Sequence, residues 1–206
     1  MPLGDISHSF DRIFRIVRDP KFLSMQGLGN EEAIFIQPYD VRKQNDVYTQ
    51  IRALHKRLEN DGIATALLSL YDIAMRRFEE RNQLEKLFER EQEIDKSRLL
   101  KHMEQMLGPE RHIAPAVRTE IESAEARLVL LYEVGEVFPY LRTHSVLNNL
   151  HTVAEHAPLV VFFPGEYVSS DSEGFYLSLF GEFKGDYYRA FHLEDYIQRG
   201  RIDVET

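Results

Sequence analysis

The chain has 206 residues, of which 43% are hydrophobic and 29% are charged, a balance typical of a globular protein with one sizeable core. Its formal net charge of -9 repels nucleic-acid phosphates, so we expect no direct binding to DNA or RNA. There is no cysteine, which excludes disulfides, thiolate metal sites and a cysteine nucleophile.

The sequence predicts neither a membrane segment nor a secretory signal. The longest apolar runs, Leu128 to Tyr132 and Leu159 to Phe163, are far shorter than the roughly 20 residues that cross a bilayer. The N-terminal sequence MPLGDISHSF lacks a basic start followed by an apolar core. We therefore expect a cytoplasmic protein that forms a single α/β domain over residues 1–206, with a loosely held tail at 194–206.

In the first half of the chain, apolar residues at helical spacing alternate with short apolar runs, which predicts alternating helices and buried strands. Pro38 and Asp40 are expected to end the first strand, and Asp61-Gly62 to end the second helix. In chain order the elements are a helix from Ile6 to Val17, a strand from Ala33 to Ile36, a helix from Val47 to Leu58 and a strand from Ala66 to Leu70.

The second half continues this alternation after a long charged stretch. The expected elements are two helices between Arg76 and Leu107 with a break near Asp95, a short helix from Ala116 to Ile121, strands at Leu128 to Tyr132 and Leu159 to Phe163 around a helix with Leu147 and Leu150, and late strands at Phe175 to Phe180 and Ala190 to Leu193 around a turn from Gly181 to Asp186. This pattern predicts an α/β fold with a mostly parallel central sheet and helices on both faces, in a Rossmann-like or P-loop-like topology lacking a Walker motif.

Two enzyme motifs are imitated only in part. Gly27 and Gly29 precede a strand, and no Gly-Lys-Ser/Thr follows, which disfavours a phosphate loop. Asp171, Glu182 and Lys184 copy the spacing of some nucleases, but the last two flank a glycine turn, whereas metal-holding groups need a rigid strand. No Gly-x-Ser-x-Gly supports a serine nucleophile. We therefore predict no catalytic residue and no cofactor.

Acidic side chains follow the predicted core strands, at positions Asp40, Asp72, Glu136 and Glu166. The carboxyl ends of parallel strands meet at one edge of a sheet, where such acids either hold a magnesium ion or cap the helices that follow. His144, Asn148 and His151 lie at helical spacing and either bind a ligand or pack as polar residues, since zinc would need a third strong ligand. The pattern leaves both alternatives open, and we assign no metal site.

The segment from Gly135 to Tyr167 differs from the rest in carrying aromatic, arginine and amide groups near predicted strand ends. Pro139 is expected near a helix start with Arg142 close after it, which suits a guanidinium that binds a carboxylate or phosphate. A rigid turn at Pro164 is expected to project an acid and an aromatic ring. The predicted partner-binding residues are Arg142, His144, Asn148, Asn149, Glu166 and Tyr167. The alternative is a helix start and a strand exit that merely pack.

Several stretches resemble the BrxB-type proteins of BREX, the bacteriophage exclusion systems of bacteria and archaea. They are FLSMQGLGNE at 22–31, IQPYD at 36–40, GEVFPYLRTHSVLNNL at 135–150, PLVVFFPGEY at 158–167, and SLFG with YYRAF between 178 and 191. The stretch Leu131-Tyr132-Glu133 departs from the resemblance, which implies smaller or less acidic residues there. The resemblance implies a small accessory component of a multi-protein complex that distinguishes self from phage DNA by methylation.

The resemblance also implies partners, namely a PglZ-type phosphatase-like protein, a large ATPase and a site-specific adenine methyltransferase, and it brings no established catalytic activity. Together with the missing catalytic motifs, it predicts a non-catalytic adaptor that binds a PglZ-like partner. The alternative is a degenerate nucleotide- or metal-dependent enzyme that acts at the C-terminal ends of the strands.

Overall fold

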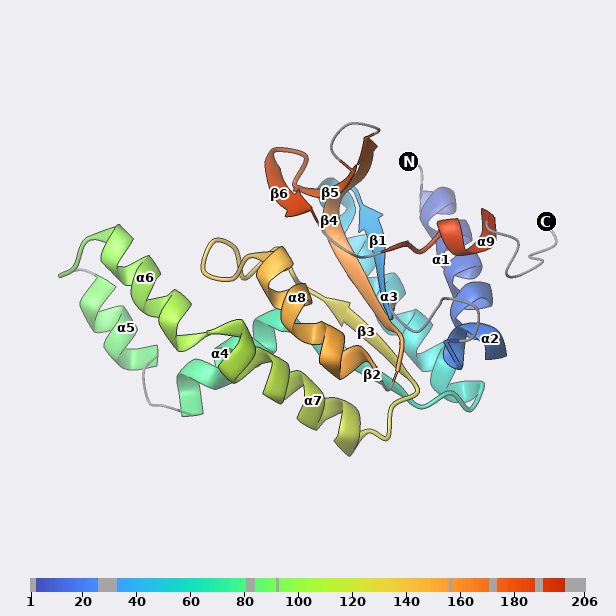
Figure 1. The fold of residues 1–206 in the computed structure, drawn as a ribbon, viewed down its shortest axis with the longest axis horizontal. Coiled ribbons are helices and arrows are strands. Elements are labelled where there is room, and N and C mark those ends of the chain that lie inside the picture. Colours follow the sequence, from blue (N-terminus) through green and yellow to red (C-terminus); the bar gives the residue numbers. More distant parts are fainter. Residues whose placement is uncertain are drawn as a thin grey trace.

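The computed structural model describes residues 3–25, 33–80, 84–91, 93–155, 157–170, 174–187 and 191–198. Its centre is a sheet whose parallel strands have the order β2-β3-β4-β1-β7, and β5 and β6 extend β4 as an antiparallel hairpin (Figure 1). The strands are β1 (Ile34–Tyr39), β2 (Thr65–Ser69), β3 (Leu128–Tyr132), β4 (Leu159–Ser170), β5 (Gly174–Leu179), β6 (Phe183–Tyr187) and β7 (Phe191–His192).

Helices cover both faces of this sheet (Figure 1). One face packs against α1 (Leu3–Val17), α2 (Pro20–Leu23), α3 (Gln44–Asn60), which follows the short 3-10 turn η1 (Val41–Lys43), and α9 (Asp195–Gln198). The other face packs against α4 (Leu70–Glu80), the π-helical turn η2 (Pro109–Ile113), α7 (Ala114–Ser123) and α8 (Thr143–Ala154). In Figure 1, α5 (Leu84–Glu91) and α6 (Lys96–Met106) project away from the sheet. The mostly parallel sheet with helices on both faces confirms the predicted fold class.

The two apolar cores follow from the alternation of side chains along buried strands. In β4, Val160 and Phe162 face α1 and α3, whereas Leu159, Val161 and Phe163 face α8. All these side chains are almost fully buried. Strands that are apolar on both faces are thus explained by two layers of helices.

Strand β1 lies in the interior of the sheet. The chain then passes through α3 to β2, which lies at the edge of the sheet. Strand β1 pairs with β4 and β7, whereas the first two strands are neighbours in the Rossmann order. The helices after β1 and β3 lie on opposite faces, α3 on one and α8 on the other. In open α/β sheets, ligands bind in the crevice beyond the carboxyl ends of the strands.

Strand β1 runs through Pro38 to Tyr39, so the prediction that Pro38 ends it is wrong. Pro38 is paired with Phe163 of β4, while β7 reaches only Phe35 and Ile36 on the other side. Proline has no N–H to donate, and it is tolerated because one side of β1 lacks a neighbouring strand at this position within the described residues.

The predicted rigid turn at Pro164 is also wrong, because β4 continues to Ser170 and pairs with β5. Gly165, with φ +151, permits this pairing, since a Cβ atom there would lie 2.1 Å from the carbonyl oxygen of Ser178. The predicted Gly181 to Asp186 turn is wrong in its second part, where β6 begins at Phe183. A Pro-Gly pair is typical of turns, and the neighbouring residues in sequence do not indicate that another strand pairs with this segment.

Other boundaries were predicted more closely. Helix α1, α3 and β3 match their predicted positions, and Asp95 caps α6 where a break was predicted. Helix α8 begins at Thr143 with Arg142 as its N-cap residue, so Pro139 lies in the preceding turn instead of at the helix start. Within the predicted loose tail, Tyr196 of α9 is 3% exposed and packs edge-on against Phe22. Gly27, Gly29 and Asp171 lie outside the described residues.

Candidate binding surface at the strand ends

Segments that are distant in sequence meet beyond the carboxyl ends of the parallel strands. Gly135, just after β3, lies so close to its neighbours that a Cβ atom there would be 2.7 Å from Pro164 and 3.0 Å from the Phe180 ring. Tyr39, the last residue of β1, is paired with Pro164. Stretches that carried the resemblance are therefore in direct contact. We call residues 133–142, 164–167 and 178–183 together with the first two turns of α8 the strand-end surface.

A tyrosine on α3 anchors the loop after β3. The Tyr48 hydroxyl donates a hydrogen bond to Glu136, and the Tyr39 hydroxyl donates to that of Tyr48 over 3.4 Å. The Tyr48 ring also packs edge-on against Tyr132, with 5.4 Å between centroids. Burial raises the pKa of both Tyr48 and Tyr39, and the hydrogen bond to Glu136 raises the pKa of Tyr48 further. Both phenols therefore stay protonated and act as donors.

A second carboxylate in the loop is held from β2. Glu133, with φ 58, accepts a hydrogen bond from the Ser69 hydroxyl, whose oxygen accepts one from the Asp72 backbone N–H at 2.8 Å. Burial raises the pKa of Glu133, and the nearby carboxylates of Glu136 and Asp72 raise it as well, against a lowering by Ser69 and Arg52. The loop thus carries two carboxylates, each bonded to a hydroxyl from another element.

Aromatic side chains cover the outside of this loop. Phe183 is 48% exposed, and its ring lies 5.0 Å from that of Phe138. Phe138 in turn packs edge-on against Phe180 at 6.4 Å. Tyr71, at the start of α4, is 39% exposed. Exposed rings that rest on a fixed backbone are typical of protein-binding surfaces.

The structure places the predicted partner-binding residues in two groups. Arg142, the N-cap residue of α8, and Asn148 within α8 are exposed. His144 and Asn149 are half-buried, and the Asn149 amide donates to the Ser145 carbonyl at 2.7 Å. On β4, Glu166 is exposed, whereas Tyr167 is half-buried with its ring 5.4 Å from that of His192. Neighbours in a strand point to opposite faces, so the side chains of Glu166 and Tyr167 lie on opposite faces of the β4 segment that belongs to the strand-end surface. The role of all six in binding stays a prediction.

The acids after the core strands do not gather into one cluster. The Asp40 carboxylate accepts hydrogen bonds from the guanidinium of Arg42, with 2.6 Å between the closest pair of atoms. Glu166 lies in the second half of β4. Within the described residues, no group of three or more histidine, aspartate or glutamate side chains is arranged to hold a metal ion. One detail remains unexplained by packing: Glu136 Oε2 is buried and has no hydrogen-bond partner among the described residues.

Sequence reasoning missed Tyr48 and Ser69, which hold the loop carboxylates. The sequence around Tyr48 predicts only helix α3, and the sequence around Ser69 predicts only strand β2. Glu133 did give a signal, because it belongs to the stretch that departs from the resemblance, and the chain adopts a left-handed conformation at this residue. A polar residue at the end of an otherwise apolar strand, such as Ser69, is a further local signal.

Comparison with known proteins places the chain in a family. A family model described as "BREX protein BrxB" matches residues 66–193, more than half of the 206 residues. The chain belongs to the BrxB family. As a BrxB-family protein it is a component of a BREX system, which confirms the predicted resemblance and its setting in antiviral defence. The matched residues include the loop after β3 and the β5–β6 hairpin of the strand-end surface.

Two curated proteins named BREX protein BrxB are similar over nearly their whole length. The one from Bacillus cereus (strain H3081.97) is 35% identical over 193 residues, which are 92% of this chain and 98% of that protein. The one from Escherichia coli O9:H4 (strain HS) is 28% identical over 191 residues, which are 91% of each chain. No solved structure matches the chain. Across the described residues, no helix combines the length and the apolar character that spanning a membrane requires.

Proposed function

We propose that this BrxB-family chain is a non-catalytic adaptor that binds a PglZ-like BREX protein through the strand-end surface. The observation that carries the proposal is an exposed aromatic ring on a rigid support, since Phe183 rests on Phe138 and Phe138 on Phe180. Exposed Arg142 lies two residues beyond Tyr140 in the same loop. Aromatic rings and arginines are the side chains most enriched among residues that dominate binding energy. We expect the adaptor to act in the cytoplasm.

The carboxylates beneath this surface support the same interpretation. Glu136 is bonded to Tyr48 and Glu133 to Ser69, so each ties the loop to a helix or a strand of the body. The Tyr140 hydroxyl adds a bond to the Glu136 carbonyl at 3.2 Å. A loop held in this way needs little ordering when it binds, which lowers the entropic cost of association.

The test is co-elution of the full chain with the PglZ-like protein of the same BREX system, followed by calorimetric titration. We expect a complex at micromolar concentrations, weakened about tenfold or more by Phe183→Ser and by Arg142→Glu. Phe88→Ser is the matched control, because Phe88 is 61% exposed on α5, which projects away from the sheet and is not part of the strand-end surface. Each variant is checked for an unchanged melting temperature.

The absence of a complex at micromolar concentrations and moderate salt would overturn the proposal. An equal loss of affinity in Phe183→Ser and Phe88→Ser would also overturn it, because it would mean that any exposed phenylalanine contributes. If the ATPase or the methyltransferase binds instead of the PglZ-like protein, the adaptor role survives and the partner assignment fails.

A second candidate is a degenerate nucleotide- or metal-dependent enzyme that acts at the strand ends, and it is favoured by the buried Glu136 Oε2 that lacks a partner among the described residues. A ligand at 100 times its dissociation constant stabilises the folded state by about 2.7 kcal/mol. An unchanged unfolding free energy with saturating magnesium and ATP would count against this candidate. A rise that Glu136→Gln abolishes would support it.

A further inference from the structure

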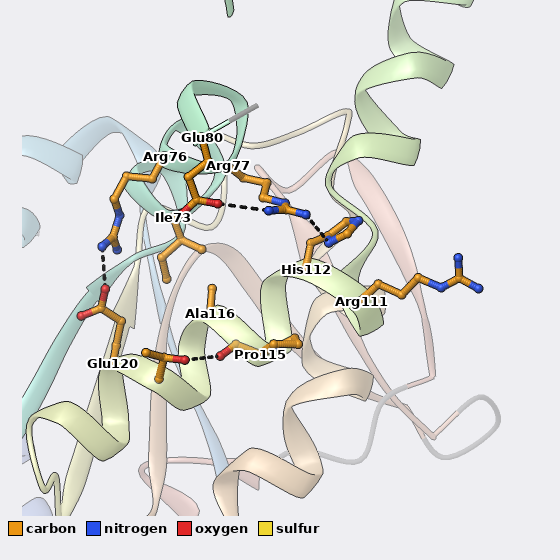
Figure 2. A pocket seen from close by; sticks show the side chains of 10 residues that line it. Ile73, Arg76, Arg77, Glu80, Arg111, His112, Pro115, Ala116 and Glu120 are labelled. Atoms are coloured by element: carbon orange, nitrogen blue, oxygen red, sulfur yellow. Dashed lines mark hydrogen bonds and ion pairs between the residues drawn. The ribbon is translucent and has the colours of Figure 1, made fainter. Parts of the chain in front are cut away.

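A cavity of about 380 Å³ lies between α4, η2 and α7, and it is separate from the strand-end surface. Its volume is within the range of small-molecule sites. Arg76 and Arg77 of α4 line it together with Ile73 below them, as Figure 2 shows. Arg111 of the π-helical turn η2 also lines the cavity, but its side chain extends away from Arg77 (Figure 2). Cationic side chains are thus concentrated here in a chain whose net charge is -9.

Arg77 is the most buried of these cations, and its guanidinium is only partly bonded. It donates to Glu80 at 3.0 Å and to His112 Nδ1 at 2.8 Å. Its Nε atom is buried and has no hydrogen-bond partner among the described residues. A guanidinium has five N–H donors, so these two bonds hold the group in place without exhausting it.

The η2 turn positions the histidine in this arrangement. A guanidinium only donates, so His112 Nδ1 accepts and carries no proton in this contact. The π-helical turn, which brings His112 to the arginine, is a rare conformation that is frequent at functional sites. His112 therefore fixes the orientation of Arg77 without adding a positive charge.

The ion pairs between the acidic residues and the arginines of the cavity are partly exposed to solvent. The Glu80 side chain is 63% exposed, and an exposed ion pair of this kind contributes little and opens readily. Arg76 donates to Glu120 at 2.6 Å, and its side chain is 53% exposed. A ligand anion that carries more charge and more acceptor oxygens than Glu80 can replace it on Arg77.

We propose that this cavity binds the phosphate group of a small ligand, with Arg77 as the principal donor and Glu80 as the resident carboxylate that the phosphate displaces. Arginine forks match both phosphate and carboxylate, and the further cation Arg76 in the lining favours the doubly charged phosphate. The apolar floor of Ile73 and Ala116 suits the carbon part of the ligand. The proposal is independent of the adaptor function.

Isothermal titration of the full chain at low ionic strength tests the site, with inorganic phosphate, pyrophosphate and AMP as separate probes. We expect binding that Arg77→Met weakens about tenfold or more, since it removes charged hydrogen bonds. Glu80→Gln is expected to strengthen binding about two- to fivefold, because it removes the competing carboxylate. Arg118→Met is the matched control, since Arg118 is an exposed residue of α7 that does not line the cavity.

The probes separate the sources of the phosphate group. Equal affinity for inorganic phosphate and AMP means that the cavity recognises the anion alone, and tighter binding of AMP means that the floor contributes. If Arg77→Met does not fold, Arg77→Lys keeps the charge and removes the fork, and the same weakening is expected. Three results would overturn the proposal: no binding of any probe at millimolar concentration, equal weakening by Arg77→Met and Arg118→Met, or succinate binding as tightly as phosphate.

Discussion

The strand-end surface and the α5–α6 projection both expose a phenylalanine, but they differ in what lies beneath it. Phe183 is 48% exposed and rests on Phe138. Phe88 is 61% exposed on a helix whose one nearly buried side chain among the described residues is Leu87. Exposure alone would rank Phe88 first. The support beneath the ring distinguishes a surface that is ready to bind from a solvated helix.

The difference extends to the backbone. Between Glu133 and Arg142, the side chains of Val134, Val137 and Leu141 are at most 2% exposed, although the segment is a loop. The α5 and α6 helices contact each other and project from the body (Figure 1). Regions with few buried apolar contacts open at low free-energy cost. We therefore expect slower amide hydrogen exchange in the loop than in α5, the reverse of what secondary structure alone predicts.

The largest expected effect comes from breaking the contact between β4 and β5. In Gly165→Ala the new Cβ would lie 2.1 Å from the Ser178 carbonyl oxygen, so the strands must separate. We expect a loss of about 3 kcal/mol or more in the free energy of unfolding. Urea denaturation measures it, and the loop 133–142 should lose hydrogen-exchange protection while α5 does not.

Gly181→Ala is the matched control for this substitution. Gly181 has φ +75, so alanine is strained there too, but no atom lies within 4 Å of the new Cβ. The expected loss is only about 1 kcal/mol, the cost of a left-handed conformation. Equal losses at the two glycines would mean that backbone conformation, and not the close approach of β5, fixes the strand-end surface.

A smaller effect is expected when the loop loses its anchor on α3. Tyr48→Phe removes the donor to Glu136 and leaves the carboxylate with a buried oxygen that already has no partner among the described residues. The expected loss is about 1 to 3 kcal/mol. Tyr39→Phe, which removes only a contact of 3.4 Å, should cost less. If both variants lose the same stability, the hydrogen bond to Glu136 is not the anchor.

The sequence predicted the layers of this fold well because burial leaves a periodic pattern. Strand β3 and helix α3 were placed closely, since apolar residues at fixed spacing are dictated by the two cores. The break near Asp95 was predicted because the apolar residues before it and after it lie on different helix faces, and in the structure Asp95 caps α6 by accepting from the Ser97 backbone N–H at 3.1 Å. Each of these features depends on neighbours in sequence.

The errors occurred where distant segments meet. Pro164-Gly165 has the composition of a turn, and only the arrival of β5 makes it a strand. The Tyr48 contact with Glu136 joins residues 88 positions apart, which no local pattern reports. The resemblance identified the right stretches, but their meeting around Gly135 became visible only in the fold.

The smallest expected effects are opposite pH dependences of the free energy of unfolding, one from the strand-end surface and one from the α5–α6 projection. Burial raises the pKa of Glu133 from its ordinary 4.5, so the folded chain holds this proton to higher pH than the unfolded chain does. Glu133 therefore contributes stability below pH 4.5 that is lost as the pH rises through its raised pKa. We expect Glu133→Gln to gain stability relative to the parent chain over this range and then to level off.

Asp95 on the projecting side should behave in the reverse way. Hydrogen bonds from the Ser97 side chain and backbone lower the pKa of Asp95 from 3.8, so its contribution is present above pH 3.8 and is lost as the pH falls through the lowered pKa. Asp95→Asn should therefore be less stable than the parent chain at neutral pH and converge with it in acid. Urea denaturation of both variants across this pH range measures the two slopes. Slopes of the same sign would mean that the loop after β3 leaves Glu133 as well solvated as a helix cap, and the rigid support inferred for the strand-end surface would be wrong.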